Sequence, residues 1–175
     1  MRQWAGALPR SPGLAASDKD VRSAYTAGLT LLARRELSEA QVQQRLLRKG
    51  HTQDAVDAAI ARLKAERAID DTRVAEAIAR TELTVRRRGR ARVERRIRSA
   101  GIARDRAQQA VDQAYAHVDS EALLVAALER KLKGRRIADQ REFQRLYRYL
   151  VSQGFESDKI LSVLRLRSKV PPSDD

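Results

Sequence analysis

The chain has 175 residues, of which 42% are apolar and 34% charged, and 36 Lys and Arg against 23 Asp and Glu give a formal net charge of +13. Because it contains no cysteine, a disulfide framework, a thiolate zinc site and a cysteine nucleophile are excluded. The longest apolar run, Ala122–Leu128, is far shorter than the roughly 20 residues that span a bilayer. Residues 1–17 lack the apolar stretch of a signal peptide. The sequence therefore predicts a cytoplasmic protein without a membrane segment.

Apolar residues recur at helical spacing from Asp18 onwards, and no segment alternates as a strand would. The first helix is expected to run from Asp18 to about Arg35. A second is expected to open at Ser38, where Gln41 three residues later completes a capping box, and a third near Thr52. The side chains predicted to face inward on the second and third helices are Val42, Leu46, Leu47, Val56, Ala59, Ile60 and Leu63.

Six more helices are predicted beyond residue 70. The fourth is expected to be capped by Asp71, and the fifth follows a break at Gly89. The seventh is expected to start at Ser120, and the eighth carries a second capping box, formed by Asp139 and Glu142. The inward-facing residues predicted for these helices include Val74, Ile78, Val85, Val93, Ile97, Ala107, Ala110, Val111, Ala114, Leu124, Ala127, Leu128, Leu132, Phe143, Leu146, Tyr147, Leu150, Ile160, Leu161 and Leu164.

Three glycines that end helices, Gly50, Gly101 and Gly154, lie 51 and 53 residues apart and sit in matching surroundings. An aliphatic residue stands four positions before each glycine and an aspartate four positions after it, at the expected start of the next helix. This pattern predicts an internal repeat. We expect an all-α protein of three tandem three-helix repeats that form an elongated, curved array. The predicted boundaries are an N-terminal tail at 1–17, repeats at 18–70, 71–119 and 120–169, and a C-terminal tail at 170–175.

The positive charge is concentrated in two stretches. The first basic cluster consists of Arg86, Arg87, Arg88, Arg90, Arg92, Arg95, Arg96 and Arg98. The second basic cluster consists of Lys131, Lys133, Arg135 and Arg136. Because guanidinium groups pair well with phosphate and carboxylate, both clusters predict contact with a polyanion and salt-dependent binding. The alternative is a solvated basic face, and part of the second cluster is also explained by the preference of cations for helix C-termini.

Motifs that carry chemistry are missing from the sequence. It contains neither a phosphate-binding Gly-x-x-x-x-Gly-Lys loop nor a dinucleotide-binding Gly-x-Gly-x-x-Gly. The only histidines are His51 and His117, and the adjacent Asp70 and Asp71 are better explained as helix-capping residues than as metal ligands. No nucleophile, base and orienting group fall together. We therefore expect no catalytic residue, no metal site and no cofactor.

Several short elements occur in an order that resembles the RecX family of recombination regulators. They are Ala33-Arg34-Arg35-Glu36-Leu37-Ser38-Glu39, Leu46-Leu47-Arg48-Lys49-Gly50, Ile69-Asp70-Asp71 with Val74-Ala75-Glu76-Ala77, Arg86-Arg87-Arg88-Gly89, Ile97, Gly101-Ile102, and Gly154-Phe155. The resemblance covers about Asp18 to Arg167. The chain departs from the family pattern at His51, where an aromatic apolar residue is usual, and at Ile69, where many members carry Leu or Phe.

The resemblance implies an all-helical protein that binds the groove of the RecA–DNA filament and inhibits ATP hydrolysis, strand exchange and coprotease activity. It implies roles in DNA repair, recombination and the SOS response, with RecA and single- and double-stranded DNA as partners. We assign the contacts with RecA or DNA to the two basic clusters and expect a monomer. The alternative function is a basic helical DNA- or RNA-binding protein that has no connection with RecA.

Overall fold

The computed structural model describes residues 17–168, and within this range the chain forms helices but no strand. The helices are α1 (Asp18–Leu32), α2 (Glu39–Arg48), α3 (Gln53–Ala65), α4 (Asp71–Thr84), α5 (Arg90–Arg98), α6 (Arg104–Tyr115), α7 (Ser120–Leu132), α8 (Gln140–Ser152) and α9 (Ser157–Arg167). The all-α prediction is therefore confirmed for this part of the chain.

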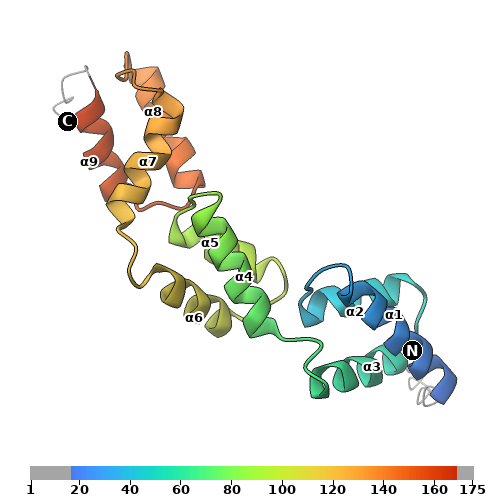
Figure 1. The fold of residues 1–175 in the computed structure, drawn as a ribbon. Coiled ribbons are helices and arrows are strands. Elements are labelled where there is room, and N and C mark those ends of the chain that lie inside the picture. The colour runs from blue at the N-terminus through green and yellow to red at the C-terminus, as the bar shows by residue number, and fades with distance from the viewer. Residues whose placement is uncertain (1–16, 169–175) are drawn as a thin grey trace, which may run out of the picture.

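The helices are arranged in three groups that follow one another along an elongated, gently curved body (Figure 1). The first group is α1–α3, the middle group α4–α6 and the third group α7–α9. The beginning of α1 and the end of α9 lie at opposite ends of this body. The predicted architecture of three tandem three-helix repeats in a curved array is confirmed, whereas the residue boundaries assigned to the repeats stay a prediction.

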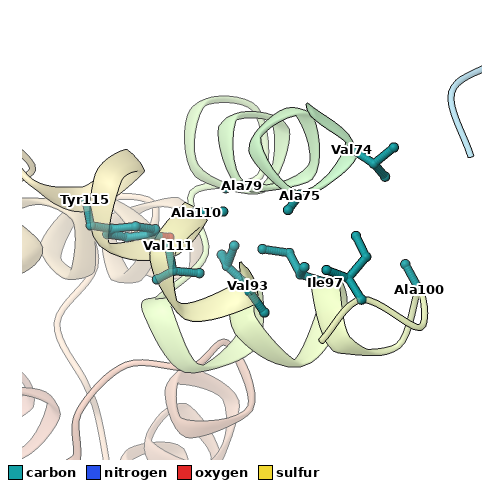
Figure 2. Packing of buried hydrophobic residues seen from close by; sticks show 11 residues of the cluster. Val74, Ala75, Ala79, Val93, Ile97, Ala100, Ala110, Val111 and Tyr115 are labelled. Carbon is teal, nitrogen blue, oxygen red and sulfur yellow. The ribbon is translucent and has the colours of Figure 1, made fainter. Parts of the chain in front are cut away.

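Each group has its own hydrophobic core. In the middle group, short side chains from α4, α5 and α6 meet around Val93 and Ile97 (Figure 2). The third group is packed with longer aliphatic side chains, among them Leu124, Leu128 and Leu150. The first group combines a cluster of larger aliphatic residues with a separate set of buried alanines on α1 and α3. A group of about 50 residues buries little surface by itself, so contacts between groups are expected to matter for stability.

Local capping explains where several helices begin. The Ser38 side chain accepts a hydrogen bond from the Gln41 amide and completes the predicted capping box. The Thr52 side chain accepts a hydrogen bond from the Ala55 amide at the start of α3. Ser17, which the sequence placed in the N-terminal tail, caps α1 in the same way. The rest of the predicted tail lies outside the described residues, as does the predicted tail at 170–175.

The structure corrects four details of the predicted helices. Helix α1 ends at Leu32 rather than near Arg35. Asp70, not Asp71, caps α4. Val85 follows the end of α4 and is 70% exposed, and Leu47 is 39% exposed, so neither side chain belongs to the core.

The capping box predicted at Asp139 and Glu142 is only half formed. The Asp139 side chain accepts a hydrogen bond from the Glu142 amide, at 2.7 Å. The Glu142 carboxylate, however, accepts from the Ala138 amide at 3.0 Å instead of from the amide of Asp139. The reciprocal bond is thus displaced by one residue, and both carboxylates still satisfy amides at the beginning of α8.

The first joint, between the first and middle groups, places the beginning of α2 against the turn after α5. The buried Ser38 hydroxyl donates a hydrogen bond to the Ala100 carbonyl oxygen. The Glu39 amide donates to the Asp71 carboxylate, at 2.9 Å. This second bond explains why Asp71 is not the cap of α4: its carboxylate is used to hold the neighbouring group.

The second joint, between the middle and third groups, repeats this arrangement with the beginning of α5 and the turn after α8. The Gly89 amide donates a hydrogen bond to the Gln153 carbonyl oxygen, at 2.9 Å. Gly154, with a φ of +90°, is so close to the Arg92 amide that an added Cβ would overlap it. In both joints the residue that precedes a helix thus donates a hydrogen bond to a carbonyl oxygen. That carbonyl belongs to the residue just before a glycine that ends another helix.

Candidate anion-binding surface

The first basic cluster lies on the loop between α4 and α5 and on α5 itself, next to the second joint. The loop is held by its backbone, because the Arg88 amide donates to the Glu82 carbonyl oxygen at 3.0 Å. The Tyr115 hydroxyl donates to the Arg88 carbonyl oxygen at 2.5 Å. Arg87, the residue before Arg88, has a φ of +52°, in the left-handed region. These hydrogen bonds hold the backbone of the turn, and the Arg87 side chain is exposed on it.

Three arginines of the first basic cluster form ion pairs inside the protein. The buried Glu82 carboxylate lies 3.1 Å from the Arg86 guanidinium and 4.0 Å from Nε of Arg88. Arg90 pairs with Asp112 on α6. These pairs reduce the charge that the cluster offers to an external anion, which the sequence analysis did not foresee.

The other arginines of this cluster keep their charge available. Arg92 donates to the Ser152 carbonyl oxygen at 2.7 Å, and Arg96 contacts the Ser99 hydroxyl at 3.3 Å, so both partners are neutral. Arg87, Arg95 and Arg98 are exposed and have no ion pair or side-chain hydrogen bond within residues 17–168. These three are the members best placed to contact a partner.

The second basic cluster occupies the end of α7 and the loop that leads to α8. The Lys131 ammonium lies 4.6 Å from the centre of the Tyr149 ring, so it covers one face of that ring. Arg135 lies 3.7 Å from the Glu142 carboxylate. Lys133 and Arg136 are exposed and without an ion pair in the described part of the chain.

The two clusters contact α8 mainly at its opposite ends, and Lys131 of the second cluster also reaches Tyr149, one turn before the C-terminal end. The first reaches its C-terminal end through Arg92 and Ser152, and the second reaches its N-terminal end through Arg135 and Glu142. A helix of 13 residues is about 20 Å long. The candidate surface is therefore bipartite, with α8 as the element that connects its halves.

Three further arginines lie on this connecting helix, outside both of the clusters that were predicted from the sequence. Arg141, Arg145 and Arg148 are all exposed, and their spacing of four and three residues places them on one helical face. The same periodicity that revealed the apolar stripe of α8 could have revealed this basic one.

Tyr115 supports the loop that carries Arg87, and its ionisation provides a test of that support. Burial is the main cause that raises the pKa of Tyr115 from 10.0 to about 12, with the neighbouring Arg90 opposing the shift. The folded state therefore favours the neutral phenol. The resulting stabilisation is complete below pH 10 and is lost as the pH rises from about 10 to 12.

We expect Tyr115→Phe to lower the free energy of unfolding at pH 7 by about 1 kcal/mol, because the hydrogen bond to Arg88 is lost. We also expect the variant to lose less stability than the wild type between pH 10 and 12. Urea denaturation followed by circular dichroism across this range measures both effects. Equal alkaline losses in the two proteins would contradict the assignment.

No three His, Asp or Glu side chains of residues 17–168 gather closely enough to hold a metal ion. None of the described helices has both the length and the apolar character required to cross a membrane.

The sequence is similar to a family of regulatory proteins. The family profile for the first three-helix domain of RecX matches residues 24–63, and the profile for the third three-helix domain matches residues 119–164. The protein named Regulatory protein RecX from Halorhodospira halophila is 32% identical over 134 residues, which cover 77% of this chain and 81% of that protein. The protein of the same name from Pelodictyon phaeoclathratiforme is 28% identical over 160 residues, 91% of this chain and 97% of its own.

Solved structures show the same fold. The crystal structure of RecX from Lactobacillus salivarius superposes with a TM-score of 0.68 at 18% identity, covering 86% of this chain and 97% of that one. A second crystal structure of a regulatory protein RecX gives a TM-score of 0.66 at 20% identity, over 83% and 71% of the respective chains.

Proposed function

Because this chain belongs to the RecX family, we propose that it regulates homologous recombination and DNA repair by binding the groove of the RecA–DNA filament. In this proposal the bound protein inhibits ATP hydrolysis, strand exchange and coprotease activity of RecA. It acts in the cytoplasm as a monomer, within the SOS response, and is not an enzyme.

The observation that carries this proposal is the combination of an elongated, curved body (Figure 1) with exposed cations at two separated places on its surface. A long body can contact more than one RecA protomer, whereas a compact domain of the same mass would contact fewer. The cations at the two ends of α8 provide contacts for acidic protein surface or DNA phosphates. We assign these contacts to both basic clusters, and within them chiefly to Arg87, Arg95, Arg98, Lys133 and Arg136.

Docking inhibits RecA only if the protein binds one conformation of the filament more tightly than another. A ligand shifts an equilibrium only by the difference in its affinity for the two conformations. We propose that the array binds most tightly to a filament geometry in which RecA hydrolyses ATP slowly. Bridging of neighbouring protomers then opposes the rearrangement that accompanies each catalytic cycle.

The experiment that tests this function is a titration of RecA ATPase activity. RecA is first assembled on saturating single-stranded DNA, and increasing amounts of this protein are added. We expect the rate to fall and to stay low when more single-stranded DNA is supplied. An unchanged rate, or one that extra DNA restores, would contradict the proposal, and the second result would favour a DNA-binding protein that acts independently of RecA.

A further inference from the structure

Helix α8 has a face made of arginine side chains opposite its core face. Arg141, Arg145 and Arg148 are exposed, whereas Leu146 and Leu150 are buried in the core of the third group. At 100° per residue, the three arginines fall within a sector of about 60°. The helix therefore presents a line of guanidinium groups directly away from the core.

This line is only weakly neutralised by the rest of the protein. Arg145 lies 3.4 Å from the Glu142 carboxylate, but the same carboxylate is also 3.7 Å from Arg135. Arg141 and Arg148 have no ion pair or hydrogen bond from their side chains among the described residues. One carboxylate thus faces two guanidinium groups, and the face keeps a net positive charge.

The line also continues beyond both ends of the helix. Arg135, at its N-terminal end, belongs to the second basic cluster, and Arg92, which donates to the Ser152 carbonyl oxygen, belongs to the first. Cations therefore follow the whole length of α8, about 20 Å. The two clusters described above become the ends of a single track.

We propose that Arg141, Arg145 and Arg148 form a DNA-binding track that contacts successive phosphates of one strand and joins the two basic clusters into one site. The inference rests on the proposed function and adds to it the residues that hold the DNA. Arg141 and Arg148 are separated by about 10 Å along the helix axis. One strand of a duplex advances by 3.4 Å or so along the duplex axis per phosphate, so the line spans about three such steps and each arginine can reach a different phosphate.

The regular spacing of the three side chains, and the fact that all three are arginine, favour phosphate over an acidic protein surface as the ligand. All three are arginine, whose planar fork binds phosphate oxygens in a bidentate way. The aromatic residues of α8, Phe143, Tyr147 and Tyr149, pack instead against the core of the third group. Because contacts with phosphates carry no sequence information, the track is expected to bind DNA without sequence preference.

The test compares the salt dependence of DNA binding in two variants that lose the same charge. One is Arg141→Gln/Arg145→Gln/Arg148→Gln. The other is Arg22→Gln/Arg34→Gln/Arg35→Gln, which removes three exposed arginines from the first group. The probes are a fluorescein-labelled 20-nucleotide oligo(dT) and a 20-base-pair duplex, and binding is followed by fluorescence anisotropy from 50 to 300 mM NaCl without RecA.

We expect the slope of log K against log[salt] to become shallower by about 2 on oligo(dT) and nearly 3 on the duplex for the α8 variant. The first-group variant should keep the slope of the wild type. A third variant, Arg141→Lys/Arg145→Lys/Arg148→Lys, should keep the slope but bind more weakly, because lysine cannot form the bidentate contact.

Equal slopes for the two glutamine variants would overturn the inference. So would an α8 variant that loses inhibition of RecA while its DNA slopes stay unchanged, since the face would then bind protein. Circular dichroism controls for folding. If the glutamine variant is unfolded, the affinity of the lysine variant provides the test, because a lysine variant that binds DNA as tightly as the wild type would also overturn the inference. Because the assay contains no RecA, its failure is separate from a failure of the ATPase titration.

Discussion

Gly154→Ala is expected to reduce the free energy of unfolding far more than Gly50→Ala, although both glycines end a helix with nearly the same backbone conformation. Their φ angles are +90° and +89°, so each substitution imposes the strain of a left-handed residue, about 1–2 kcal/mol. The space around an added Cβ is different. Nothing lies within 4 Å at Gly50, whereas at Gly154 the Cβ would overlap the Arg92 amide and lie 2.7 Å from the Arg92 Cβ.

The additional cost at Gly154 comes from moving backbone across the second joint. Overpacking of this kind costs about 1–3 kcal/mol. Urea denaturation of both variants measures the difference, and small-angle X-ray scattering reports whether the angle between the middle and third groups changes. If the two variants were equally destabilised, the close approach of Gly154 to α5 would not contribute to stability, and our description of the second joint would be wrong.

Charge reversal at Arg87, Arg95 and Arg98 is expected to raise the concentration needed for half-maximal inhibition of RecA by at least tenfold. The loss of one close charge pair at an interface costs about 2 kcal/mol or more, and reversal adds repulsion. These three side chains are exposed and have no partner in the described structure, so the substitutions Arg87→Glu, Arg95→Glu and Arg98→Glu should leave helical content unchanged.

The matched control reverses Arg22, Arg34 and Arg35 on the first group, which alters the net charge by the same amount. We expect this control to inhibit RecA nearly as well as the wild type. Loss of inhibition in both variants would indicate a response to overall charge alone. Retained inhibition in the first would show that these arginines do not form the contact.

The fold could be predicted from the sequence because its determinants are local and repeated. The capping residue Ser38 and the recurring helix-ending glycines mark helix boundaries through bonds that span only a few residues. Asp70 and Asp71 are an example of a detail that local patterns could not predict. Both carboxylates suit a cap, and the choice depends on the Glu39 amide, which lies 32 residues away and takes Asp71 as its partner.

The candidate site was predicted less completely, because ion pairing is a tertiary property. The density of arginine around Gly89 predicted a basic surface, and Arg87, Arg95 and Arg98 are exposed there. It gave no sign that Glu82 would be buried beneath Arg86 and Arg88, or that Asp112 would reach Arg90 from α6. Position along the sequence alone cannot separate a cation held by its own protein from one that is free to bind a partner.

The central claim is that this protein acts by docking along the RecA filament, and electron cryomicroscopy tests it most directly. RecA filaments assembled on single-stranded DNA with a non-hydrolysed ATP analogue would be imaged with and without a saturating amount of the protein. We expect a curved body of three helical groups in the filament groove, in contact with at least two neighbouring protomers, with α8 facing the DNA. Filaments whose groove stays empty while the protein coats only free DNA would contradict the account.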